Sequence, residues 1–112
     1  NKHVSKGVVI LRYCFDIDGT ICSTNCEYKD SVPYREVIDW INKKYDEGHS
    51  ITLFTSRGTS SGVDWFEFTE KQVNDWGVKY HELKLGKPAY DLFIDDRAIN
   101  NEEWYKQEGL SV

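Results

Sequence analysis

A long run of apolar and β-branched residues near the start of the chain breaks off abruptly into carboxylates. Residues 8–15 read Val-Val-Ile-Leu-Arg-Tyr-Cys-Phe, and residues 16–20 read Asp-Ile-Asp-Gly-Thr. A nearly continuous run of this kind is typical of a strand that is buried on both faces in a parallel sheet. We therefore expect a parallel α/β sheet in which one core strand ends just before Asp16.

The rest of the chain continues the alternation of helices and strands. Apolar residues recur at helical spacing in two segments, and each of these segments ends at a glycine. The expected elements are a helix from Pro33 to Gly48, a strand over 51–55, a helix from Trp65 to Gly77, an edge strand over 78–83, a strand over 90–94 and a short helix capped by Asn100 or Asn101. This pattern predicts a Rossmann-like, three-layer parallel sheet with helices on both faces.

Length and composition set the broad class. A chain of 112 residues is expected to form one domain, residues 1–112, with residues 1–7 as a flexible N-terminal extension. The net charge is −5 and the basic residues do not cluster, which argues against nucleic-acid binding except to a chain end as substrate. No apolar run is long enough to span a membrane and no secretory signal is visible, so the cytoplasm is the expected compartment.

The three cysteines are expected to be reduced thiols, because an odd number in a chain with an apolar core does not indicate a disulfide framework. Cys22 and Cys26 have the spacing of two zinc ligands. A structural zinc site needs four ligands, however, and the three histidines are scattered along the sequence. Zinc is therefore disfavoured.

Polar groups collect where three of the expected strands end. The strands run into Asp-Ile-Asp at 16–18, Thr-Ser-Arg at 55–57 and Asp-Asp at 95–96. Open parallel sheets bind ligands at the carboxyl ends of their strands. Asp16 and Asp18 repel each other unless a cation lies between them, and Gly19 allows the chain to turn out of the strand. The alternative is a simple Asp-Gly turn without chemistry.

These features together resemble the haloacid dehalogenase (HAD) superfamily, and in particular its small aspartate-dependent phosphatases without a cap domain. The resemblance extends from Tyr13 to Asn100. It is carried by residues 16–20, Thr55, Lys87 within Gly-Lys-Pro, and the Asp95-Asp96 pair. No separate cap domain fits, because the intervals between these motifs are each taken up by one helix.

The resemblance implies a magnesium-dependent phosphomonoester phosphatase. Asp16 would be the nucleophile that forms an aspartyl-phosphate, and Asp18 the general acid and then the general base. Thr55 and Lys87 would bind the phosphoryl group. Magnesium would be held by Asp16, by the backbone carbonyl of Asp18 and by Asp96, with Asp95 beside them.

Several positions keep a competing interpretation. Lys84 competes with Lys87 as the phosphate-binding lysine, and Ser56 competes with Thr55 as the phosphate-binding hydroxyl. Arg57 either binds a substrate anion or caps a helix end. Asp95 and Asp96 either bind metal or cap a turn.

The missing cap predicts an open site. We expect a sugar phosphate, a nucleotide or a phosphorylated polymer end as substrate, or a homo-oligomer in which a partner covers the site. Tyr28, Lys29 and the loop at 59–65 are the nearest candidates for substrate contact. The alternative functions are another phosphoryl transferase such as a phosphomutase, a dehalogenase, or a weakly active regulatory module that keeps a metal site.

Overall fold

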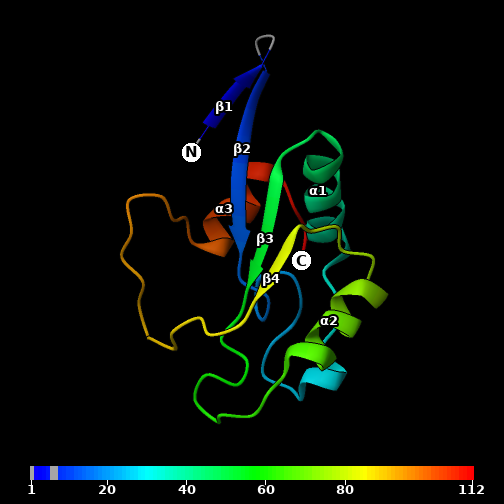
Figure 1. Ribbon diagram of the computed structural model, residues 1–112, viewed down its shortest axis with the longest axis vertical. Coiled ribbons are helices and arrows are strands. Elements are labelled where there is room, and N and C mark those ends of the chain that lie inside the picture. Colours follow the sequence, from blue (N-terminus) through cyan, green and yellow to red (C-terminus); the bar gives the residue numbers. More distant parts are fainter. Residues whose placement is uncertain (1, 6–7) are drawn as a thin grey trace.

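The protein is described by a computed structural model, which covers residues 2–5 and 8–112. One four-stranded sheet has the order β1-β2-β3-β4 (Figure 1). The helices and strands, in chain order, are β1 (Lys2–Ser5), β2 (Val8–Phe15), the 3₁₀ turn η1 (Tyr28–Asp30), α1 (Arg35–Asp46), β3 (Ser50–Phe54), α2 (Phe66–Asp75), β4 (Glu82–Lys84) and α3 (Asn101–Glu108).

The core of the sheet is parallel, as the sequence predicts. β2 pairs with β3 and β3 pairs with β4, both in parallel, with Phe15 opposite Leu53 and Leu53 opposite Leu83. β4 has one neighbouring strand and is therefore an edge strand, which confirms its predicted place. It is shorter than the predicted strand over 78–83, because Val78 still bonds back to Val73 at the end of α2.

β1 adds an antiparallel strand that the sequence does not predict. Its residues pair with the first half of β2, from Lys2 opposite Leu11 to Ser5 opposite Val8. The resulting hairpin projects from one end of the molecule (Figure 1). Residues 1, 6 and 7 of the expected N-terminal extension lie outside the described residues.

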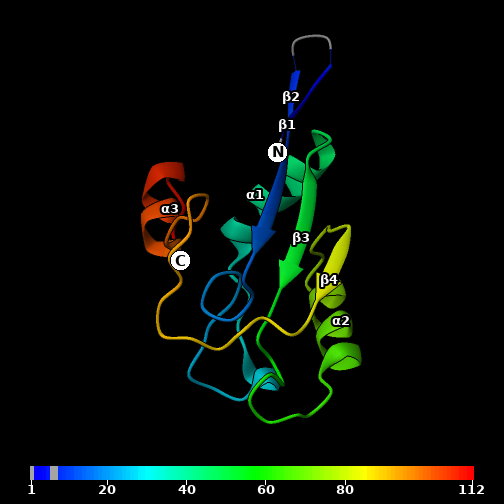
Figure 2. The ribbon, with the colours of Figure 1, turned by 60° about the vertical axis from the view of Figure 1, so that its left-hand side comes forward.

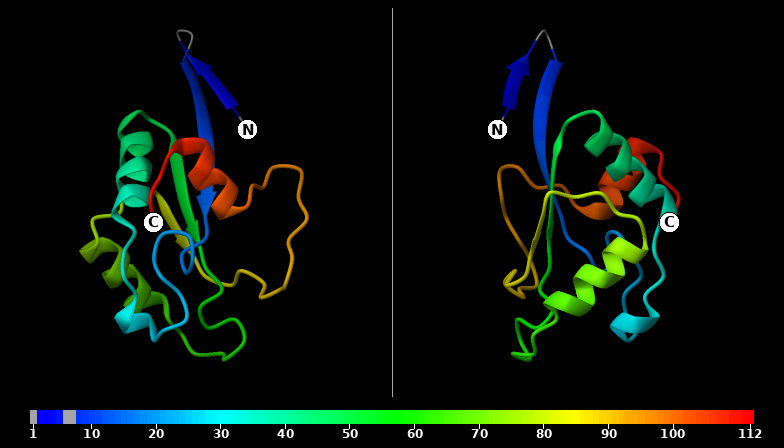
Figure 3. Two further views of the ribbon diagram at one scale, coloured as in Figure 1. Left: turned by 180° about the vertical axis from the view of Figure 1, so that it is seen from behind. Right: turned by 45° about the vertical axis from the view of Figure 1, so that its right-hand side comes forward.

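All three α-helices lie on the same side of the sheet (Figures 2 and 3), so the prediction of helices on both faces is wrong. The strand order explains this arrangement. The chain moves in one direction from β2 to β3 to β4, and two successive right-handed crossovers place both connecting helices on one face. On the other face Arg12 and Cys14 of β2 are exposed, which corrects the expectation of a strand buried on both sides.

The core lies between the sheet and these helices. Its fully buried apolar side chains come from β3, α1, α2 and the turn after β2: Ile17, Ile21, Cys22, Val37, Ile38, Ile41, Ile51, Leu53 and Val73. An aromatic cluster extends the core toward α3, where the Trp40 ring meets Tyr13 edge-on at 5.4 Å and Trp104 at 4.9 Å. Trp40 is thus a packing residue, and its indole N–H donates to Glu108 at 3.0 Å.

The segment between β4 and α3 departs furthest from the prediction. Residues 90–94 do not form a strand, and every residue from 88 to 100 is exposed. The segment runs out on the side away from the helices (Figure 3). A strand exists only if its backbone groups find a partner strand, so the apolar pattern of residues 90–94 is not sufficient to form one. The cap of the last helix was correctly predicted, since Asn100 accepts a hydrogen bond from the Glu102 N–H.

Candidate active site

The chain turns sharply out of β2 immediately after Phe15. The Ile17 carbonyl accepts hydrogen bonds from the N–H groups of Thr20 and Ile21, at 3.1 and 2.9 Å. Gly19 has a φ of 82°, a left-handed conformation that a residue with a side chain rarely adopts. Because the chain turns here, Asp16 and Asp18 are not held on opposite sides of one strand. Their charges interact, since Asp18 contributes to raising the pKa of Asp16.

The carboxylate of Asp16 is paired with the ammonium group of Lys87. Lys87 Nζ lies 3.2 Å from Asp16 Oδ1, and about a third of the Asp16 side chain is exposed. Burial raises the pKa of the Asp16 carboxyl above its ordinary value, and the Lys87 ammonium opposes this rise without cancelling it. Asp16 is thus an accessible carboxylate whose negative charge has a cation beside it.

Backbone contacts place Lys87 rather than Lys84 at this position. The Lys87 N–H donates to the Thr55 carbonyl at 3.1 Å, and the Lys87 carbonyl accepts from the Thr59 hydroxyl at 2.9 Å. The Phe93 ring lies 4.9 Å from Lys87 Nζ, a cation–π contact. Lys84 instead lies 3.6 Å from Glu82 on the exposed edge strand. Of the two lysines that the sequence left open, the structure therefore brings Lys87 to Asp16.

Asp18 has a different cationic partner. Arg57 Nε donates to Asp18 Oδ2 at 2.9 Å, and Arg57 Nη2 donates to Asp18 Oδ1 at 2.8 Å. This two-point pairing is the strongest geometry available to a carboxylate and a guanidinium group. The Cys22 thiol, 3.6 Å away, also donates to Asp18 Oδ1. The two aspartates of the motif are therefore held by two different cations.

Arg57 is buried, which weakens its assignment as a substrate-binding residue. Its side chain has no exposed surface. The remaining guanidinium nitrogen, Nη1, donates to Thr69 at 3.2 Å and to Gln72 at 2.7 Å on α2. The Tyr28 ring covers the guanidinium carbon at 4.4 Å. With all three nitrogens engaged, Arg57 acts on the site through Asp18 rather than through direct contact with a ligand.

The hydroxyl groups that follow β3 differ in their surroundings. Thr55 is 1 % exposed, and its Oγ1 accepts a hydrogen bond from the Arg57 N–H at 3.1 Å. Its backbone N–H donates to the Lys84 carbonyl at 2.9 Å. Thr55 therefore fixes the segments that carry Arg57 and Lys87. Ser56 is partly exposed, and its carbonyl accepts from the Thr59 N–H at 3.0 Å.

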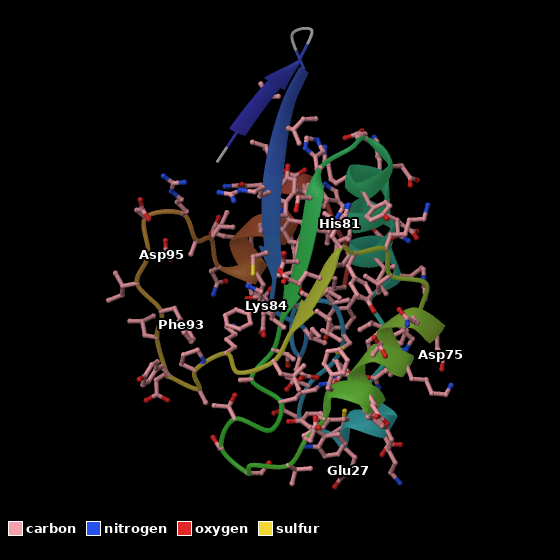
Figure 4. The ribbon with its side chains drawn as sticks, viewed as in Figure 1. Glu27, Asp75, His81, Lys84, Phe93 and Asp95 are labelled. Atoms are coloured by element: carbon pink, nitrogen blue, oxygen red, sulfur yellow. The ribbon has the colours of Figure 1, made fainter. Side chains whose placement is uncertain are left out.

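Asp95 and Asp96 are not brought to Asp16 and Asp18. Both lie on the exposed segment before α3, and Figure 4 places Asp95 and Phe93 on its outward course. Asp95 Oδ1 accepts from the Arg97 N–H at 2.8 Å, the turn-capping use that the sequence left open, and this bond holds the pKa of Asp95 below its ordinary value. Among the described residues, no three His, Cys, Asp or Glu side chains are close enough to hold a metal ion together. The predicted magnesium ligands are therefore not assembled in this conformation.

Three residues around Arg57 belong to the site although the motifs did not single them out for this role. Thr69 and Gln72 accept from Arg57, and Tyr28 covers it. The predicted helix from Trp65 to Gly77 contains Thr69 and Gln72, and Tyr28 is predicted only as a candidate for substrate contact. Helical spacing was the available signal, because Thr69 and Gln72 are three residues apart and therefore share a face of α2.

None of the described helices is both long enough and apolar enough to cross a membrane.

Comparison with known proteins supports the fold and is silent on the chemistry. No protein-family model matches the chain, and no curated protein does so either. The crystal structure of a structural-genomics target from Vibrio cholerae superposes with a TM-score of 0.76 at 24 % sequence identity, covering 85 % of this chain and 87 % of that one. At this level of identity the similarity shows the fold alone, a small α/β domain with a parallel sheet.

Proposed function

We propose that this protein is a magnesium-dependent phosphomonoester phosphatase of the haloacid dehalogenase type, with Asp16 as its nucleophile. The observation that carries the proposal is the Asp16–Lys87 pair at the carboxyl ends of the strands, with Asp18 two residues further on. A carboxylate attacks an anionic phosphate only when the repulsion between them is offset. Lys87, at 3.2 Å from Asp16, supplies one positive charge for this purpose.

In the proposed reaction, an Asp16 oxygen attacks phosphorus and the bond from phosphorus to the leaving oxygen breaks. The Asp18 carboxyl gives its proton to that oxygen as the alcohol departs. Water then attacks the aspartyl-phosphate and passes a proton to Asp18, which releases inorganic phosphate and restores Asp16. Arg57 only donates hydrogen bonds, so one Asp18 oxygen would have to leave Arg57 to carry the proton, while the other would stay bonded to Arg57 and keep the carboxyl group in place.

Magnesium is the proposed cofactor, and Asp16 and the Asp18 carbonyl offer oxygen donors of the kind that it prefers. Asp96 reaches these donors only if the exposed segment of residues 88–100 moves. One edge of β2 could accept this segment, because β1 pairs only with residues 8–11 of β2. In the described part of the chain, the corresponding edge of residues 12–15 has no partner strand. Residues 90–94 would fit there as a parallel strand that ends in Asp95 and Asp96.

The experiment that tests the proposal is hydrolysis of p-nitrophenyl phosphate with magnesium and with a chelator. Asp16→Asn should reduce turnover by about a thousandfold or more, because it removes the nucleophile. Asp39→Asn is the matched control, since Asp39 is an exposed carboxylate on α1, and it should keep full activity. Undiminished turnover by Asp16→Asn would contradict the mechanism.

A second candidate is a binding or regulatory module with little turnover. The pairing of Asp18 with Arg57 favours it, because both oxygens of the proposed acid are occupied. So does the separation of Asp95 and Asp96 from the motif. An absence of magnesium-dependent hydrolysis across a panel of phosphomonoesters, together with saturable binding of inorganic phosphate or a phosphoester, would support this candidate.

A further inference from the structure

Gln72 lies between the Arg57–Asp18 pair and the loop that carries Tyr28. Its Oε1 accepts a hydrogen bond from Arg57 Nη1 at 2.7 Å, and its Nε2 donates to the Tyr28 carbonyl at 2.6 Å. Both functional atoms of one side-chain amide are thus used, one toward the site and one toward the loop. Gln72 and Tyr28 are 44 positions apart in the sequence, so this bridge is made only by the tertiary fold.

The guanidinium group of Arg57 is held from two sides. On the side away from Asp18, its guanidinium group is held by Thr69 and Gln72, and the bond to Gln72 is the shorter of the two. The Tyr28 ring lies over the guanidinium group. The Tyr28 ring is in turn held edge-on by Trp65 at 4.8 Å. A change at Gln72 therefore removes both a contact to Arg57 and the contact that ties the loop around Tyr28 to α2.

The position of Arg57 matters because Arg57 holds Asp18. Both oxygens of Asp18 accept from Arg57, so a shift of the guanidinium group moves the carboxyl group relative to Asp16. A misplacement of about 1 Å is enough to reduce a proton transfer step substantially. The contact chain runs from Tyr28 through Gln72 and Arg57 to Asp18.

We propose that Gln72 is a positioning residue of this site, which fixes Arg57 and thereby Asp18 and couples both to the loop around Tyr28. This inference rests on the proposed phosphatase function. Gln72 would not touch the substrate phosphate. A change at Gln72 would slow the step in which Asp18 protonates the leaving oxygen. This step limits the rate for esters with a poor leaving group.

The leaving group provides a selective test. p-Nitrophenolate departs without a proton, whereas the alkoxide of glycerol phosphate needs one. The ratio kcat/KM reports only the steps up to departure of the alcohol, so hydrolysis of the aspartyl-phosphate does not enter it. For Gln72→Met, kcat/KM on glycerol phosphate should fall at least about tenfold more than kcat/KM on p-nitrophenyl phosphate. An equal fall with both esters would show that Gln72 is merely structural and would overturn the proposal.

Two variants control the measurement. Lys71→Met removes an exposed ion pair with Asp75 on the same helix and should leave the ratio of the two kcat/KM values unchanged. Gln72→Glu keeps an acceptor oxygen for Arg57 but places a second acceptor against the Tyr28 carbonyl, so its ratio of the two kcat/KM values should lie between those of the wild type and Gln72→Met. Gln72 is only partly buried and borders a groove of about 330 Å³ next to α2, and Met and Glu have side chains of the same length as Gln. Circular dichroism confirms that each variant is folded.

A second measurement does not depend on turnover. Nuclear magnetic resonance of the Arg57 Nε–H should give a persistent signal at neutral pH in the wild type and in Lys71→Met, because that proton is buried and bonded to Asp18. The signal should broaden or disappear in Gln72→Met, and an unchanged signal there would refute the positioning role. If the wild type hydrolyses neither ester, the proposed function fails, and this measurement still decides whether Gln72 holds Arg57.

Discussion

The guanidinium group of Arg57 donates to both carboxylate oxygens of Asp18, at 2.9 and 2.8 Å, from a side chain that has no exposed surface. The two residues are 39 positions apart and follow neighbouring strands. This pair connects the motif after β2 to the segment after β3. Each aspartate of the motif therefore pairs with its own cation, Asp18 with Arg57 and Asp16 with Lys87.

Removal of Arg57 should be strongly destabilising. Arg57→Met leaves the Asp18 carboxylate, which is 23 % exposed, without its cation, and it leaves Thr69 and Gln72 without their donor. Breaking a buried pair on one side costs about 3 to 5 kcal/mol. Arg57→Lys should recover only part of this loss, because an ammonium group cannot reproduce the two-point pairing. Urea unfolding followed by circular dichroism measures the free energy, and a loss below about 1 kcal/mol would contradict the pair's structural role.

The two lysines should differ sharply in their effect on activity. Lys87→Met removes the cation at 3.2 Å from Asp16, so we expect kcat/KM for p-nitrophenyl phosphate to fall by about a hundredfold or more. Lys84→Met removes an exposed lysine whose partner is Glu82, and the same quantity should change less than about twofold. Steady-state kinetics of both variants provide the comparison. A larger effect at Lys84 would reverse the assignment.

The three cysteines should react with iodoacetamide in a fixed order. The thiolate is the reactive form, so a raised pKa slows alkylation. Cys26 is exposed and should react first. Cys14 is exposed on the open face of the sheet, but partial burial raises its pKa, so it should react more slowly. Burial and the neighbouring Asp18 raise the pKa of Cys22 to about 12, so it should react only after unfolding. Mass spectrometry of timed samples at pH 7 and 25 °C reads out this order.

Magnesium should order the exposed segment before α3 if Asp96 is one of its ligands. The backbone amides of residues 90–94 should exchange with deuterium within seconds in a chelator, because the segment is exposed and not part of a strand. Their exchange should slow by about tenfold or more with excess magnesium, once they pair with β2. Asp96→Asn should abolish this protection. Protection by magnesium that survives Asp96→Asn would remove Asp96 from the ligand set.

Local sequence signals were sufficient for most elements of the fold. Helical periodicity identified α1 and α2, and Gly48 and Gly77 mark their ends with φ angles of 96° and 77°. The Asn100 cap is equally local, because it depends on a side chain and an N–H group two residues apart. The turn at Gly19 could also be predicted, because its backbone bonds join the Ile17 carbonyl to N–H groups only three and four residues further on.

The errors occurred where an element depends on distant partners. Residues 90–94 have the composition of a strand, but a strand forms only when it pairs with a neighbouring strand. In the described conformation no strand lies beside these residues. β1 shows the converse, because it forms against the first half of β2 without a strong apolar pattern of its own. The face on which the helices lie follows from the strand order, which no single segment encodes.

For the site, the sequence by itself determined which chemical groups are present: two aspartates after one strand, a hydroxyl and an arginine after the next, and a lysine near the third. Only the tertiary structure decided how they pair. Lys87 is chosen over Lys84 because Thr55 and Thr59 hold its backbone, and Arg57 is assigned to Asp18 because Thr69 and Gln72 enclose it. Short-range patterns fix turns, caps and helices, whereas the pairing of charges depends on distances between residues that are far apart in the chain.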